Sequence, residues 1–279
     1  MLSVSQHREK LALLTAAAVP GLTIIACPGK ALAQTLYDNA ESLGSLQAPY
    51  GVVSNPGGGS GGFDLSALTA PDETIGISPN PANNFSVLDD FTVPAGQTWN
   101  LTGANLLGYT TNAATVTITG ARVQIFRGDP RSGGVVAFGN LTNNVQTSAS
   151  FLNIYRASST TPTNTQRRLQ LSTTSFQTVL TAGQYWLQYA LTSSTGFVFT
   201  PPLTPSGAAV STGNAIQFDS STSTYANFVD GSNFKGIPFQ LIGTVQNEPG
   251  PVQSAPGPVP VLGAAAFFGY ARKLRRRQK

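Results

Sequence analysis

Apolar side chains at every second position constrain the fold of this chain more than any other feature. The clearest case is residues 184–191, where one face carries Tyr185, Leu187, Tyr189 and Leu191. A period of two residues is typical of a half-buried β-strand. About ten strand-like segments occur between residues 86 and 245, and none of them has a convincing helical period. The pattern predicts an all-β chain that folds as a single jelly-roll-like β-sandwich.

The composition agrees with many short strands joined by turns. The 279 residues include 29 Gly and 19 Pro, and only 10% are charged, which disfavours long solvated helices. Residues 34–81 are rich in Gly, Pro, Asn and Ser, and we interpret them as a long loop between early elements of the same domain. No repeat of fixed period and no interior linker is visible. Residues 34–246 are therefore predicted to form one β-sandwich domain with a Gly-rich N-terminal part.

The strand pattern also predicts where the chain turns in its central part. In residues 87–93, Val87, Phe91 and Val93 share one face, and Asp89 lies among them. The following Pro-Ala-Gly-Gln sequence, residues 94–97, predicts a turn. The strand expected after this turn carries four large apolar side chains in one phase, namely Trp99, Leu101, Leu107 and Tyr109.

The first 33 residues have the three parts of a secretory signal peptide. A basic polar region precedes an apolar run over residues 11–26, and Ala31 and Ala33 supply the small side chains of a cleavage site. Cleavage at this site would make Gln34 the first residue of the mature chain. The export machinery is therefore an expected partner.

Cys27 allows a second interpretation of the same segment. Residues 24–27, Ile-Ile-Ala-Cys, resemble the lipobox of bacterial lipoproteins, in which the cysteine is acylated and becomes the first residue. Pro28 directly after the cysteine is unfavourable for acylation, and the Ala-x-Ala site follows closely. Cleavage before Gln34 is the preferred interpretation.

The positions of cysteine and histidine exclude several kinds of site from the mature chain. The only cysteine, Cys27, and the only histidine, His7, both precede Gln34. Their removal excludes an intrachain disulfide, a thiolate nucleophile, a Ser-His-Asp triad and a Cys/His zinc site. No cofactor is expected. Carboxylates, tyrosines, lysines, arginines and hydroxyls remain for any chemistry.

The net charge of +4 does not describe the predicted domain. Between Gln34 and Pro258 there are 7 basic and 11 acidic residues, which gives this part of the chain a net charge of −4. The excess of basic residues lies at the two termini. A nucleic-acid partner for the domain is therefore not expected.

A few side chains of the domain are candidates for binding, each with a simpler structural interpretation. Asp89 and Asp90 are adjacent and would point to opposite faces of a strand, so they cannot form a paired glycosidase site together. One of them could bind calcium with a loop carboxylate such as Asp219 or Asp230, although hydrogen bonding and solvation at a strand edge is the favoured role. The two tryptophans are weak candidates for a platform that stacks on sugar rings, but core packing is favoured for both Trp99 and Trp186.

The C-terminal region divides into a linker and a short apolar segment with a basic end. Residues 247–258 form a Pro-rich, semi-extended linker, and residues 259–279 follow it as a sorting or anchor segment that includes a short apolar helix. The uncharged stretch 259–271 has 13 residues, fewer than the ~20 that span a bilayer without tilt. The basic end predicts a cytoplasmic C-terminus and a domain on the other side of the membrane, which agrees with the signal peptide.

This tail resembles the PEP-CTERM sorting signal of Gram-negative bacteria. The resemblance covers the last 23 residues and rests on a proline motif, a short apolar helix and a basic cluster, in that order. The residues of the proline motif and the basic cluster are Pro258, Val259, Pro260, Arg272, Lys273, Arg275, Arg276 and Arg277. The motif departs from the eponymous Pro-Glu-Pro because it has no Glu. The resemblance implies recognition by an exosortase, a membrane cysteine transpeptidase, and an association with exopolysaccharide and biofilm. The alternative is a simple tail anchor.

The leading hypothesis is a non-enzymatic, exported protein, structural or adhesive, directed to the cell surface or the extracellular matrix. Its expected partners are the export machinery, an exosortase-like membrane enzyme and exopolysaccharide, with membrane contact through the C-terminal segment. Anchoring in the inner membrane would be transient or permanent. The main alternative is a carbohydrate-binding module for extracellular polysaccharide, and a carboxylate-based hydrolase is third.

Overall fold

A computed structural model describes residues 32–40, 50–204 and 212–247, and the prediction of an all-β sandwich is confirmed. The predicted signal peptide, except its last two residues, lies outside the described residues, as do the linker from residue 248 and the sorting segment. Where the chain is described, the only complete helical elements are the three-residue turns η2 (Ser60–Gly62), η3 (Pro81–Asn83) and η4 (Pro130–Ser132). None of the described helices is long and apolar enough to cross a membrane. The strands are β1 (Gln34–Asp38), β2 (Asp64–Leu68), β3 (Phe85–Thr110), β4 (Ile118–Arg127), β5 (Val135–Asn140), β6 (Gln146–Ser158), β7 (Arg168–Thr174), β8 (Thr178–Ser193), β9 (Val198–Phe199), β10 (Ile216–Asp219), β11 (Thr224–Asn227), β12 (Val229–Asp230), β13 (Asn233–Phe234) and β14 (Phe239–Asn247).

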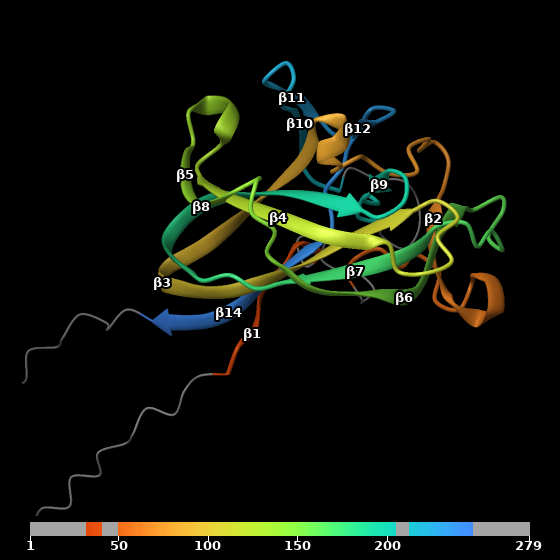
Figure 1. Cartoon of the computed structure of the whole chain (residues 1–279), viewed down its shortest axis with the longest axis horizontal. Helices are drawn as coiled ribbons and strands as arrows, with labels where there is room; N and C mark the ends of the chain where they lie inside the picture. Colours follow the sequence, from red (N-terminus) through yellow and green to blue (C-terminus); the bar gives the residue numbers. More distant parts are fainter. Residues whose placement is uncertain (1–31, 41–49, 205–211, 248–279) are drawn as a thin grey trace, which may run out of the picture. The chain divides into compact units, whose positions relative to one another are not determined.

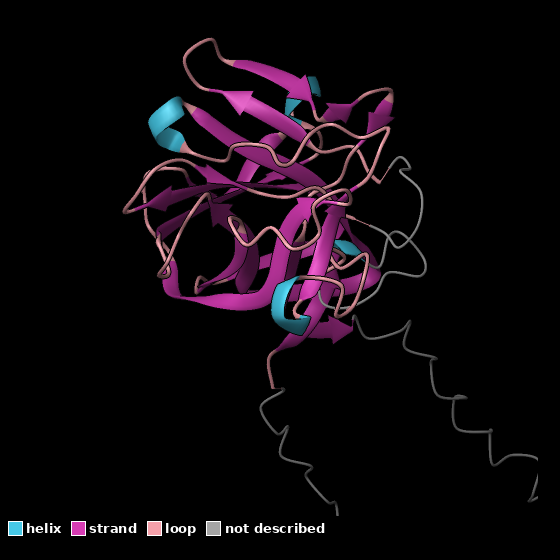
Figure 2. Cartoon of the chain, turned by 90° about the vertical axis from the view of Figure 1, so that its right-hand side faces the viewer, coloured by secondary structure: helices cyan, strands magenta, loops and turns pink. Residues whose placement is uncertain are grey.

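Two layers of strands face each other (Figures 1 and 2). The long strands β3 and β8 run through both layers and join them. The first layer has the order β11-β10-β3-β8-β4-β5. The second has the order β1-β14-β3-β7-β6-β2, with residues 178–181 of β8 paired to residues 98–101 of β3, and only β2 and β6 pair in parallel. The first part of β3, residues 85–93, lies in the first layer, and residues 97–108 lie in the second.

The turn predicted at residues 94–97 is wrong, because the chain bends there without reversing. β3 continues as one strand of 26 residues, and its register with β8 shifts between Val93 and Thr98. Gly96 adopts a φ of 75°, which accommodates the extra residues of the bend. The partner strand β8 passes through the same bend, so both strands continue from one layer into the other.

A second irregularity corrects the phase predicted for the later half of β3. Leu101 pairs with Gly243 of β14, whereas Gly103 pairs with Ile242, so Thr102 is an extra residue in β3. A single extra residue moves the following side chains to the other face of a sheet. Trp99 and Leu101 therefore lie in the core between the layers, while a separate cluster contains Leu107 and Tyr109.

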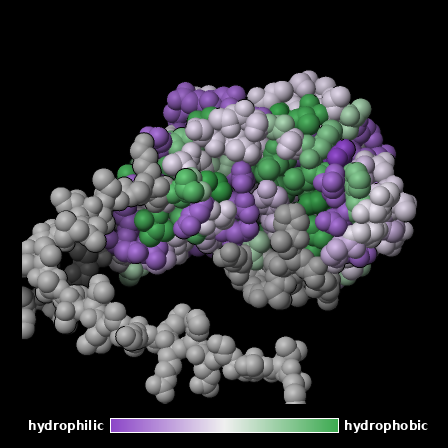
Figure 3. Space-filling model, turned by 90° about the horizontal axis from the view of Figure 1, so that it is seen from below, coloured by the Kyte–Doolittle hydropathy of each residue, from purple (hydrophilic) through white to green (hydrophobic). Residues whose placement is uncertain are grey.

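The main core fills the space between the two layers. Phe91 lies at its centre, with its ring stacked on Trp99 at 6.3 Å and on Tyr185 at 5.6 Å between centroids, and edge-on to Phe239 at 6.4 Å. Two smaller apolar clusters lie apart from this core and contain buried residues of the strands that do not face it. Seen from below, the surface mixes hydrophobic and hydrophilic residues (Figure 3). The fold therefore depends on one large apolar core and a few covered patches.

Candidate functional site

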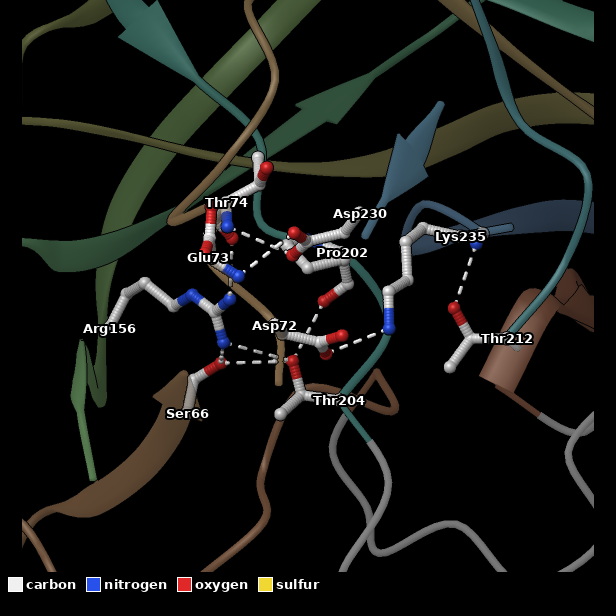
Figure 4. A network of polar contacts seen from close by, with 11 residues as sticks. Ser66, Asp72, Glu73, Thr74, Arg156, Pro202, Thr204, Thr212, Asp230 and Lys235 are labelled. Atoms are coloured by element: carbon white, nitrogen blue, oxygen red, sulfur yellow. Dashed lines mark hydrogen bonds and ion pairs between the residues drawn. The ribbon is translucent and has the colours of Figure 1, made fainter. Parts of the chain in front are cut away.

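The most unusual feature of the described residues is a group of buried charges around the connection between β2 and β3. Residues 72–75 of this connection, here called the strap, are held by three charged side chains from other parts of the fold (Figure 4). These side chains are Arg156 of β6, Asp230 of β12 and Lys235, which follows β13.

Arg156 is buried, with 1% of its surface exposed, and it donates to the strap and to two hydroxyls. Its Nε lies 2.8 Å from the carbonyl oxygen of Ile75, and its Nη2 lies 3.2 Å from that of Thr74. Its Nη1 lies 3.2 Å from Thr204 Oγ1 and 3.4 Å from Ser66 Oγ. Burial lowers the pKa of Arg156 to about 10, and the neighbouring Tyr109, Asp72 and Asp230 oppose this shift. The guanidinium stays charged near neutral pH.

Asp230 and Lys235 complete the attachment of the strap. The carboxylate of Asp230 accepts the backbone N–H groups of Glu73 at 2.8 Å and Thr74 at 2.9 Å. Lys235 Nζ lies 2.7 Å from Asp72 Oδ2, and the lysine and aspartate side chains are 1% and 15% exposed. The strap is thus bound by its carbonyls, its N–H groups and one of its own carboxylates. Because buried charges are stable only when they are paired and hydrogen-bonded, this group determines where the connection lies.

Asp89 is a second buried carboxylate, and its favoured interpretation as a solvated strand-edge residue is wrong. It lies on the same face as Val87 and Phe91, as predicted, but only 2% of its surface is exposed. Its Oδ2 accepts from Asn39 Nδ2 at 2.7 Å and from the N–H of Ile237 at 2.9 Å. Its Oδ1 accepts from the N–H of Asp90 at 3.0 Å. Burial raises the pKa of Asp89 to about 7, although these donors pull it downward.

The other candidate carboxylates are not gathered with Asp89. The predicted opposite orientation of Asp90 is confirmed, since its Oδ2 accepts from Gln184 Nε2 at 2.9 Å on the other face of the strand. Asp219 Oδ1 accepts from the N–H of Ser221 at 2.8 Å and from its hydroxyl at 2.6 Å. Among the described residues there is no group of three or more His, Cys, Asp or Glu side chains that could hold a metal ion. The carboxylates suggested for calcium therefore make separate local contacts.

Both tryptophans are core residues in the structure. Trp99 is 4% exposed, and its Nε1 donates to Gln97 Oε1 at 3.0 Å. Trp186 is 1% exposed and lies on the face opposite Tyr185 and Leu187, but the guanidinium of Arg131 covers its ring at 5.1 Å from the centroid. Neither ring offers an open face to a sugar. The favoured interpretation, core packing, describes both residues.

No family model, curated protein or solved structure matches this chain.

A partly exposed aromatic group that the sequence did not indicate lies on β6 and the loop before β2. Phe63 stacks on Tyr155 at 5.3 Å between centroids, and the guanidinium of Arg168 lies 5.1 Å from the ring of Phe63 and 4.6 Å from that of Phe151. Each of these planar side chains is stacked against another one of the group. The stack therefore attaches the Gly-rich loop to β6 and β7 and does not form an open platform.

The buried charges of the strap were also missed from the sequence. One weak signal existed: Lys235 is the only lysine between Gln34 and Pro258, and a strongly apolar strand follows it. An isolated lysine before an apolar strand predicts a buried side chain only when its acidic partner is also known. Asp72 lies 163 residues away in the sequence, so no local pattern connects the two.

Proposed function

We propose that the chain is an exported structural or adhesive protein, directed to the cell surface or extracellular matrix by a C-terminal exosortase-type sorting signal. The observation that carries this proposal is the pairing of the first strand with the last. Gln34, the first residue after the predicted cleavage site, pairs with Gly243, and β14 ends at Asn247, where the Pro-rich linker begins. Removal of the signal peptide and processing of the tail would leave every strand among the described residues intact.

The position of the two strands also suits attachment from one side. β1 and β14 pair directly, so both ends of the sandwich lie at the same edge of the second layer (Figure 1). A domain held near a membrane by a tail after β14 would keep the opposite edge available for contact with other molecules. This arrangement supports a tethered or surface-displayed domain and requires no catalytic residue.

The buried charges support a structural role in the same way. Asp72, Asp89 and Asp230 are engaged by donors from the chain itself. Each of these carboxylates holds a backbone segment or a loop in place, which is a structural role. Exopolysaccharide stays a proposed partner of the protein, and the tryptophans suggested for it are covered.

The proposal predicts two processed ends, which mass spectrometry of terminal peptides from the surface fraction would detect. We expect an N-terminus at Gln34 and a C-terminus that lacks the apolar segment from residue 259 onward. An acylated Cys27 at the N-terminus would instead support the lipoprotein interpretation. A surface protein that still carries residues 259–279 would show a permanent anchor and contradict sorting by cleavage.

A further inference from the structure

The ion pair of the strap brings a nucleophile and a carboxyl carbon together in the interior of the domain. Lys235 Nζ lies 2.7 Å from Asp72 Oδ2, with 1% and 15% of the two side chains exposed. We propose that Lys235 and Asp72 become joined by an intramolecular amide bond after the domain has folded. The inference does not depend on the proposed destination of the protein.

Both partners are held in place by their backbones. The N–H of Lys235 donates to the carbonyl of Phe228 at 2.9 Å, and its carbonyl accepts from the N–H of Ala215 at 2.9 Å. On the strap, the two residues after Asp72 donate to Asp230 at 2.8 and 2.9 Å. Reacting groups that are fixed at contact distance behave as a unimolecular pair, which strongly accelerates bond formation.

The environment favours the uncharged product over the ion pair. Transfer of two charges into the interior costs desolvation free energy that their mutual attraction offsets only in part. Asp72 Oδ1 is also buried without a hydrogen-bond partner, so the carboxylate is only half satisfied. An amide carries no charge and needs fewer partners than the ions that it replaces.

The reaction is balanced within the pair. The ammonium of Lys235 transfers a proton to the carboxylate of Asp72, and the neutral amine then attacks the carboxyl carbon Cγ. The C–N bond forms, a proton moves from the nitrogen to the hydroxyl oxygen on Cγ, the bond between Cγ and that oxygen breaks, and one water molecule leaves. No oxidant or reductant is needed. The hydrogen bonds of Arg156 go to other groups, but its buried positive charge attracts Asp72 and would favour negative charge on the oxygens of the intermediate.

Such a bond would supply a covalent link that this chain cannot obtain from cysteine. No cysteine follows Cys27, so a disulfide within the domain is excluded. An amide between residues 72 and 235 would join the strap to the segment after β13 and close a loop of the chain. Closed loops restrict the unfolded chain and so stabilise the folded one.

The test is peptide mass spectrometry of the full chain, purified in the folded state and then denatured and digested. We expect a branched peptide that contains both Asp72 and Lys235, with a mass lower than the sum of its parts by one water molecule. Trypsin should also fail to cleave after Lys235. Recovery of separate, unmodified peptides with normal cleavage after Lys235 would overturn the proposal, whatever the variants do.

Two variants serve as controls. Lys235→Arg retains the cation but lacks the amine, and Asp72→Ala lacks the carboxyl carbon, so neither should give the branched peptide. A branched peptide that persists in either variant would show that different residues are joined and would also overturn the proposal. Cyclisation of an N-terminal Gln34 releases ammonia and is confined to the N-terminal peptide, so it cannot be mistaken for the predicted product.

Discussion

Replacement of Arg156 by Met is expected to lower the free energy of unfolding by about 3–5 kcal/mol. Met preserves most of the length and apolar contact of the side chain but removes its charge and its donors. The carbonyls of Thr74 and Ile75 would lose their guanidinium partner, and the nearby carboxylates of Asp72 and Asp230 would lose a balancing positive charge. Urea unfolding followed by circular dichroism measures the difference.

A matched control is available on the surface. Arg127 ends β4 and is exposed, so Arg127→Met is expected to change stability by no more than about 0.5 kcal/mol. Arg156→Lys should fall between the two, because it restores the charge without the planar arrangement of donors. Equal effects of the Met substitutions at positions 156 and 127 would contradict the importance assigned to the strap.

Replacement of Asp89 by Ala is expected to lower the free energy of unfolding by about 3 kcal/mol or more, because three donors lose their acceptor at once. The N–H of Ile237 and the amide of Asn39 are buried and would be left without this partner. The same substitution at Asp90, on the other face of β3, should cost less than about 1 kcal/mol. Similar losses at both positions in a urea titration would refute the structural role of Asp89.

Asp89 should also leave a signature in the dependence of stability on pH. Its pKa is raised to about 7 in the folded protein, whereas the unfolded value is near 4. The folded state therefore binds the proton more tightly, so this group stabilises the fold below about pH 4, and that contribution is lost as the pH rises to about 7. The difference in unfolding free energy between the wild type and Asp89→Asn should fall across this window. A constant difference would contradict the raised pKa.

The alternation of apolar residues was sufficient to predict the all-β fold and the face that Asp89 shares with Val87 and Phe91, since both depend on the local period of two. The bends were harder to predict. The Pro-Ala-Gly-Gln sequence at residues 94–97 is typical of a turn, and only the matching bend in β8 shows that β3 continues. The extra residue at Thr102 has no local signal, because it is defined by the pairing with β14.

The buried polar groups depend on contacts between distant segments, and this explains why sequence reasoning missed them. Asp72 and Lys235 are each unremarkable in their own surroundings, and their burial follows from the way the strap crosses the fold. Core packing was favoured for Trp186, but its position out of phase with Tyr185 and Leu187 does not show what covers it. The loop that carries Arg131 covers it, and an alternation pattern contains no information about such a cover.

In the proposed function, the C-terminal basic cluster directs an exported domain to its destination. The most direct test is cell fractionation with an antibody to the folded domain, applied to the full chain, to a chain that lacks residues 272–279, and to Arg127→Ser as a control for loss of a basic residue. We expect the full chain and the control at the cell surface or in the medium, and the truncated chain unprocessed and in a different fraction. If the truncated chain shows the same processing and the same location as the full chain, the sorting signal is refuted.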